Sequence, residues 1–257
     1  MVKPIVFFDI DGTLLDENKE IPVTTKQAVK QLKSNGVYVA IATGRAPYFF
    51  EDIREELEID TYVSCNGQFV VFEGETIYEH PLHRGQLKQL YEETDKDGIP
   101  LVFMQEKEMF ATVGGHPYIE NSLHELGIAY PSVESNLAGL GETYQGLMFC
   151  KEGEEKKYAD KYSDFTFLRW HELALDILPK GNSKAVGVQK VLEKSGFNKV
   201  ESFAFGDGLN DIEMLQKVGY GIAMGNAKEE LKMVADFITA PVSNDGIFHG
   251  LRHAKLI

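Results

Sequence analysis

The sequence has little of what would place it in a specialised class of protein. Its 257 residues include two cysteines that do not form a CxxC pair, so we expect free thiols and no disulfide scaffold. No apolar run reaches the length of a membrane-spanning helix, and no apolar segment with a cleavage site follows the start of the chain. These absences predict a soluble, cytoplasmic protein that has no contact with a membrane.

Positive charge is scarce as well. The chain has 26 Lys and Arg residues against 40 Asp and Glu residues, a formal net charge of −14, which argues against a nucleic-acid partner. A small phosphorylated ligand is compatible with this charge, because local cations and backbone amides can bind it. The seven histidines show no metal-site spacing, so we expect no histidine metal centre. Composition leaves the oligomeric state open between a monomer and a small homo-oligomer.

What the sequence does contain is an alternation of strands and helices at both ends of the chain. Residues 5–8 and 37–42 are continuous apolar runs, the pattern of buried parallel strands, and an amphipathic helix is predicted between them at 22–35. The same alternation resumes at Lys184. It predicts an α/β fold with a doubly wound, Rossmann-like parallel sheet.

The middle of the chain has a different pattern. Adjacent strands predicted at 165–170 and 174–178 can pair as a hairpin, which is typical of α+β domains and not of βαβ units. We therefore predict a catalytic core made of residues 1–80 and 184–257. The segment 81–183 is predicted to be an inserted α+β cap domain.

Polar signatures follow three of the apolar strands, and a fourth opens the helix at which the core resumes. They are Asp9-Ile10-Asp11-Gly12-Thr13, Thr43-Gly44-Arg45, Gly206-Asp207-Gly208-Leu209-Asn210-Asp211 and Lys180-Gly181-Asn182-Ser183-Lys184. Because the carboxyl ends of parallel strands share one edge of a sheet, these segments should converge. Oxygen ligands without nearby His or Cys favour Mg²⁺ over zinc, so the inventory suits phosphate chemistry with a hard divalent ion.

These four segments, in this order, resemble the four motifs of the haloacid dehalogenase (HAD) superfamily. The inserted domain resembles the large cap of the Cof-type, class IIB phosphatases, and so do three short segments, Asn66-Gly67, Gly225-Asn226-Ala227 and Asn244-Asp245-Gly246. The resemblance spans essentially the whole chain and is weakest in the cap. It implies a Mg²⁺-dependent phosphatase that hydrolyses small phosphorylated metabolites, such as sugar phosphates, through an aspartyl-phosphate intermediate.

The resemblance also implies roles for individual residues. Asp9 would be the nucleophile, and Asp11 would donate a proton to the leaving alcohol and then take one from water. A pKa raised by the neighbouring Asp9 would help Asp11 to donate that proton. Lys184, and not Lys180, would neutralise the charge on Asp9 and the phosphate.

A metal site and a phosphate pocket are implied in the same way. Mg²⁺ would be held by Asp9, by the backbone carbonyl of Asp11 and by Asp207, while Asp211 would orient a metal-bound water or Lys184. Thr43, counted with the catalytic residues, would hydrogen-bond the phosphoryl oxygens. The predicted substrate-binding residues are Thr43, Gly44, Arg45 and Asn210.

Several interpretations stay open at this point. Arg45 could contact the substrate, pair with a cap carboxylate or form a surface ion pair. Asn66 and Gly67 could line the site, although a tight turn is the favoured interpretation. A phosphomutase or a non-catalytic, phospho-accepting signalling protein are the alternative functions. The signalling alternative fits less well, because such a domain would be about half as long and would carry no insertion.

Overall fold

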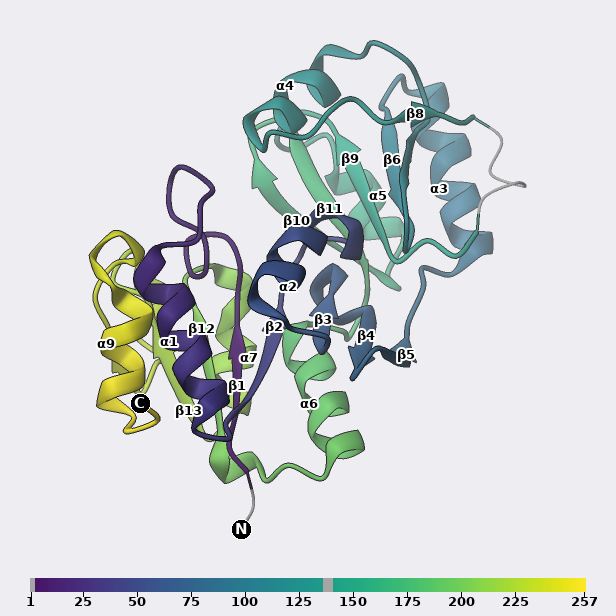
Figure 1. Ribbon diagram of the computed structural model, residues 1–257. Helices are drawn as coiled ribbons and strands as arrows, with labels where there is room; N and C mark the ends of the chain where they lie inside the picture. The colour runs from purple at the N-terminus through teal and green to yellow at the C-terminus, as the bar shows by residue number, and fades with distance from the viewer. Residues whose placement is uncertain (1–2, 136–140) are drawn as a thin grey trace. The chain divides into compact units, whose positions relative to one another are not determined.

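The structure is a computed structural model that describes residues 3–135 and 141–257 (Figure 1). The chain divides into two compact units. The core unit comprises Met1–Arg45, Phe49–Tyr78 and Asn182–Ile257, and the inserted unit comprises Ala46–Tyr48 and Glu79–Gly181. In the described part of the chain, no helix combines the length and the apolar character needed to cross a bilayer.

The core unit is built on an eight-stranded sheet. In spatial order the strands are β14 (Phe237–Ile238), β13 (Tyr220–Ala223), β12 (Ser202–Gly206), β1 (Ile5–Phe8), β2 (Tyr38–Ala42), β3 (Tyr62–Ser64), β4 (Phe69–Phe72) and β5 (Glu75–Glu79). Neighbouring strands from β14 to β3 are parallel, and β4 is antiparallel to β3. The predicted α/β fold with a parallel sheet is confirmed.

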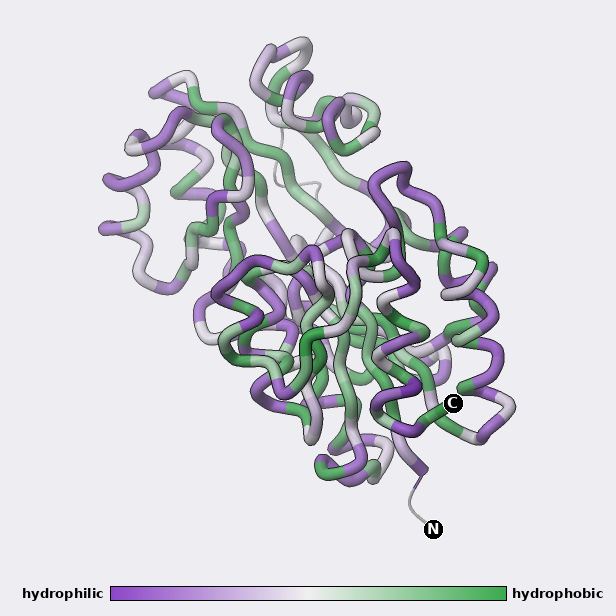
Figure 2. Tube along the Cα trace, turned by 90° about the vertical axis from the view of Figure 1, so that its left-hand side faces the viewer, coloured by the Kyte–Doolittle hydropathy of each residue, from purple (hydrophilic) through white to green (hydrophobic). Residues whose placement is uncertain are grey.

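Helices cover both faces of this sheet. They are α1 (Val23–Ser34), α2 (Glu51–Leu57), α6 (Lys184–Ser195), α7 (Ile212–Lys217), α8 (Glu229–Lys232) and α9 (Gly246–His253). On one face, Val188 of α6 and Met214 of α7 pack with Ile5 and Phe7 of β1. On the other face, α9 packs on β12 at Gly250. A side chain at this position would collide with the aromatic ring of Phe205. The trace colours in Figure 2 show hydrophobic residues concentrated in the strands that these helices cover.

The register of the three central strands places the polar signatures at one edge. Phe8 of β1 is aligned with Ile41 of β2 and with Phe205 of β12. Since the strands are parallel, Asp9 and the residues that follow Ala42 and Gly206 leave the sheet at the same level. This is the convergence that open α/β sheets offer to ligands.

The inserted unit contains a six-stranded sheet. Its strands, in spatial order, are β10 (Phe165–His171), β11 (Ala174–Pro179), β9 (Gln145–Phe149), β6 (Leu101–Met104), β7 (Met109–Ala111) and β8 (Ser132–Val133). The predicted pairing of β10 with β11 is antiparallel, and the short strand β8, which the pattern did not predict, runs parallel to β7. The helices are α3 (Arg84–Lys96), α4 (Pro117–Glu125) and α5 (Lys156–Lys161). Residues of α3 and α5, such as Leu90 and Tyr158, pack on one face of this sheet.

Candidate active site

A buried lysine joins two carboxylates at the edge of the core sheet. The Nζ of Lys184 lies 2.6 Å from Oδ1 of Asp9 and 2.7 Å from Oδ1 of Asp211. Only 1% of Lys184 is exposed, and Asp211 is fully buried. Lys184 is the first residue of α6, so the helix start fixes where the ammonium enters the site.

The second oxygen of Asp211 is held by its own loop. It accepts hydrogen bonds from the backbone amides of Asp207, at 3.0 Å, and Gly208, at 2.9 Å. Gly206 lacks the side-chain carbon that would lie 2.5 Å from the Asp211 carboxyl. Asp211 therefore orients Lys184 with one carboxylate oxygen and holds the loop that carries Asp207 with the other.

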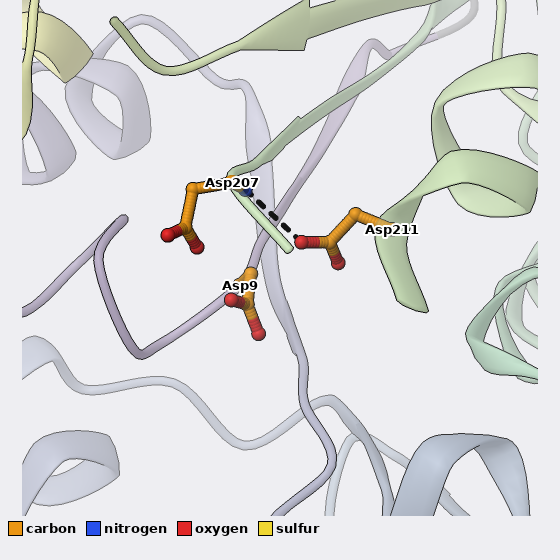
Figure 3. A group of neighbouring side chains, drawn as sticks. All are labelled: Asp9, Asp207 and Asp211. Carbon is orange, nitrogen blue, oxygen red and sulfur yellow. Dashed lines mark hydrogen bonds between the residues drawn. The ribbon is translucent and has the colours of Figure 1, made fainter. Parts of the chain in front are cut away.

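Asp9, Asp207 and Asp211 each bring one carboxylate oxygen within 4.8 Å of the others (Figure 3). Gly12 allows this approach: its φ is +72°, and a side chain there would lie 2.2 Å from Oδ2 of Asp207. The Asn226 side chain donates to the carbonyl of Gly12 at 2.8 Å and so holds the same loop. A set of oxygen ligands alone fits a hard divalent cation. Because Asp211 is engaged elsewhere, Asp9 and Asp207 are the carboxylates that fit as direct ligands.

The charges of this cluster are strongly coupled. Burial, followed by repulsion from Asp211, raises the pKa of Asp9 although Lys184 opposes the shift. The same two causes raise the pKa of Asp207 to about 6. Burial lowers the pKa of Lys184, but attraction to Asp211 and Asp9 outweighs it, so the net shift is upward. The lysine stays charged, and a bound cation would further stabilise the ionised carboxylates.

Asp11 has a different environment from the one expected. Arg45 donates from Nε to Oδ2 at 2.8 Å and from its terminal nitrogen to Oδ1 at 2.7 Å, and Lys19 lies 3.0 Å from Oδ1. Burial raises the pKa of Asp11, but these two cations outweigh burial and lower it. The expectation of a pKa raised by Asp9 is therefore wrong, because the opposite charges of Arg45 and Lys19 contact Asp11 directly. The structure places the Arg45 guanidinium on Asp11, a carboxylate of the core unit that the alternatives for Arg45 had not named.

The predicted phosphate-binding groups line the same edge. Thr43 is 1% exposed, and its hydroxyl accepts a hydrogen bond from the amide of Arg45 at 3.1 Å, which leaves the hydroxyl proton to donate. Gly44 follows it, and Asn210 donates from Nδ2 to Oδ1 of Asn66 at 2.9 Å. All nine predicted site residues thus lie in the core unit.

Sequence reasoning did not assign Lys19 or Asn226 to this site, and it ranked a place for Asn66 in the site below a turn. The tight turn favoured for Asn66-Gly67 is present: both residues have positive φ values, of 53° and 96°, and the amide of Gln68 donates to the carbonyl of Cys65 at 3.2 Å. The turn lies within a four-residue connection, because Ser64 pairs with Phe69. In the inserted unit, His171 contacts Ser122 at 3.0 Å and Glu125 at 3.3 Å, which joins α4 to the end of β10.

Comparison with known proteins gives a consistent result. A family model described as haloacid dehalogenase-like hydrolase matches residues 6–251. The crystal structure of a hypothetical protein from Geobacillus kaustophilus HTA426 is 53% identical, has a TM-score of 0.95, and matches 99% of this chain and 100% of that chain. A Bacillus subtilis (strain 168) protein named "Putative phosphatase YkrA" is 44% identical over 257 residues, 100% of either chain.

A third similar protein is named for an activity. The HAD subclass IIB sugar phosphatase BT4131 is 31% identical, with a TM-score of 0.87, and the match covers 99% of this chain and 100% of that chain. The likeness therefore extends over both units of the chain.

Proposed function

Because the chain belongs to the haloacid dehalogenase-like hydrolase family and is a phosphatase of that family, we propose that it hydrolyses small phosphorylated metabolites with the help of Mg²⁺. The observation that carries this proposal is the buried contact of Lys184 with Asp9 and Asp211, 2.6 and 2.7 Å long, beside Asp207. A nucleophilic carboxylate, a charge-neutralising ammonium and oxygen ligands for a hard cation meet there, as phosphoryl transfer requires.

In the first half of the reaction, an oxygen of Asp9 attacks phosphorus and the bond to the leaving alcohol breaks. The alcohol takes a proton from Asp11, and an aspartyl-phosphate forms on Asp9. Lys184 stays charged beside Asp9 and neutralises part of the negative charge that accumulates on the phosphoryl oxygens. Arg45 and Lys19 favour the ionised form of Asp11, so at least one of their contacts with it has to be broken before Asp11 can carry a proton.

In the second half, water attacks the phosphorus and loses its proton to Asp11, and the bond between phosphorus and Asp9 breaks. The ionised state of Asp11, which Arg45 and Lys19 favour, suits this step. The Thr43 hydroxyl, the Gly44 amide and the Asn210 amide would donate hydrogen bonds to the phosphoryl oxygens throughout.

Mg²⁺ would be held by Asp9, Asp207 and the backbone carbonyl of Asp11. When bound, it would polarise the phosphoryl group and screen its charge from the carboxylates. The carboxylate donor set described above supports this choice. Cys65 and Cys150 form no disulfide, which agrees with a location in the reducing cytoplasm.

The test is release of inorganic phosphate from a panel of phosphate esters by the purified protein, with Mg²⁺ and with a chelator. Sugar phosphates head the panel because BT4131 is named a sugar phosphatase. We expect Asp9→Asn to lower kcat at least about a thousandfold, since the nucleophile is lost. Asp52→Asn, at an exposed position of α2, is the matched control and should keep full activity. Full turnover by the Asp9 variant would contradict the proposal.

Isotopically labelled water separates hydrolysis from transfer between substrates. A phosphatase places one water oxygen in each released phosphate, whereas a phosphomutase returns the phosphoryl group to an organic acceptor. Label in the free phosphate would exclude the mutase alternative. A long-lived acyl-phosphate without turnover would favour a signalling role instead.

A further inference from the structure

The loop that follows β3 has an unusual backbone. Cys65, Asn66 and Gly67 all have positive φ values, of 49°, 53° and 96°. A left-handed conformation costs residues other than glycine about 1–2 kcal/mol, although Asn tolerates it better than most. Two such residues in succession next to a catalytic centre call for an explanation from their surroundings.

The loop is held from two sides. The amides of Cys65 and Asn66 donate to the carbonyls of Arg45, at 3.0 Å, and Thr43, at 3.1 Å. On the other side, Gly67 packs so closely on the start of α6 that a side chain would lie 2.1 Å from the Ser183 carbonyl. The loop therefore joins the Thr43–Arg45 segment to the helix that carries Lys184.

The side chain of Asn66 reaches into the proposed phosphate pocket. It is 4% exposed, and its Oδ1 accepts the hydrogen bond from Nδ2 of Asn210. It also packs beneath Gly44, where an added side-chain carbon would lie 3.1 Å from Nδ2 of Asn66. One carboxamide thus contacts two of the groups that would bind phosphoryl oxygens, and these groups lie in the loops that follow two different strands, β2 and β12.

We infer that Asn66 is a positioning residue of the phosphoryl pocket, which sets the separation between the Thr43–Gly44 backbone and the Asn210 amide. This inference rests on the proposed function, because it assigns those groups to the phosphate. It differs from a turn role, in which only the backbone conformation of Asn66 would matter. Displacing reacting or binding groups by about 1 Å can cost a hundredfold in rate.

Replacement by glycine distinguishes the two roles. Glycine accepts a φ of 53° without strain, so Asn66→Gly deletes the carboxamide and preserves the turn. We expect a loss of about 10- to 100-fold in kcat/KM for p-nitrophenyl phosphate, a similar loss of affinity for inorganic phosphate with Mg²⁺, and little change in melting temperature. Glu58→Gly is the matched control, because Glu58 has a φ of 54° but is exposed at the end of α2; its activity should not change. Full activity and phosphate affinity in Asn66→Gly would overturn the inference.

Coupling to the two partners sharpens the test. If Asn66 acts through Asn210, combining Asn66→Gly with Asn210→Ala should weaken phosphate binding no more than the more damaging of the two single changes does. Losses of binding free energy that add up in the double variant would count against the proposal. Gly44→Ala disturbs the same contact from the other side and keeps the proposal testable if Asn66→Gly does not fold. We expect it to weaken phosphate binding about tenfold, and unchanged binding would contradict the role. Phosphate binding is measured by calorimetry, which needs no turnover and tests the role of Asn66. The proposed function is tested separately, by whether the wild-type protein hydrolyses any ester.

Discussion

Buried carboxylates occur in both units of the chain, and their surroundings differ. In the core unit, Asp9 and Asp211 share the ammonium of Lys184, and all three side chains are buried. In the inserted unit, Asp176 lies in the middle of β11 and is 9% exposed. No ion pair joins it to a cation of residues 3–135 or 141–257, and its hydrogen bonds come from the neutral side chains of Gln145 and Trp170.

The two arrangements have different electrostatic consequences. Burial raises the pKa of Asp176 to about 7, with the two hydrogen bonds only partly opposing the shift, so this acid can become neutral near physiological pH. The core cluster cannot avoid charge in this way, because Lys184 has a raised pKa and remains an ammonium. A buried ion pair usually adds little net stability compared with apolar residues. Its presence in the core unit is therefore explained by chemistry, whereas the neutral acid of the inserted unit needs only its hydrogen bonds.

Among the variants that compare the two units, the largest loss of stability is expected from removing the core cation. Lys184→Met leaves Asp9 and Asp211 buried without their partner, which should destabilise the protein by about 3–5 kcal/mol at neutral pH. Phosphatase activity should fall by at least about a hundredfold. Urea unfolding and phosphate release measure the two losses.

Lys180→Met is the control for this change. Lys180 is exposed and belongs to the same sequence motif, so its loss should leave stability within about 0.5 kcal/mol and activity unchanged. Equal effects of the two variants would mean that the buried contact of Lys184 has no special role in the core unit.

A smaller, pH-dependent effect is expected in the inserted unit. Because the folded pKa of Asp176, about 7, lies above its unfolded value, the folded protein binds an extra proton between about pH 4 and 7. Stability linked to this proton is lost as the pH rises through 7. Asp176→Asn, which cannot ionise, should therefore gain roughly 2–3 kcal/mol relative to the wild type between pH 5 and pH 8. Unfolding free energies at the two pH values provide the measurement.

Asp160→Asn, at an exposed position of α5, should show no such dependence. If Asp176→Asn and Asp160→Asn respond alike to pH, Asp176 is not held as a neutral acid and the contrast between the units fails.

Much of the core site was predictable because it depends on strand register. Apolar runs identified β1, β2 and β12, and parallel alignment alone brings Asp9, Thr43 and Asp207 to one edge. Side-chain partners were harder to predict. Lys19 contacts Asp11 because Asp16 closes a tight loop, accepting the amides of Asn18 and Glu20, and no periodic pattern encodes that loop.

Tertiary contacts also fix the start of an element. Helix α8 begins at Glu229, and the amide of the preceding Lys228 donates to the carbonyl of Asp207, a contact that no local pattern encodes. Asn66-Gly67 forms the tight turn that its sequence predicts, but the close packing of Gly67 on Ser183 could not be read from the sequence. The position of Asp176 in a strand was predictable, but its lack of a cationic neighbour was not.

The smallest effects concern the pairing of Asp11, where the core unit holds a half-exposed carboxylate. Arg45 makes two hydrogen bonds to it and Lys19 makes one, so Arg45→Met should matter more than Lys19→Met. If their role is to place Asp11 for proton transfer, alkyl phosphates should suffer most, since alkoxide leaving groups need a proton and p-nitrophenolate does not. We expect kcat/KM for an alkyl ester to fall about tenfold with Arg45→Met and about twofold with Lys19→Met, with p-nitrophenyl phosphate little affected. Equal losses of kcat/KM on both substrates would instead assign Arg45 to phosphate binding. The ion pair between Arg45 and Asp11 would then be a contact that the substrate phosphate replaces.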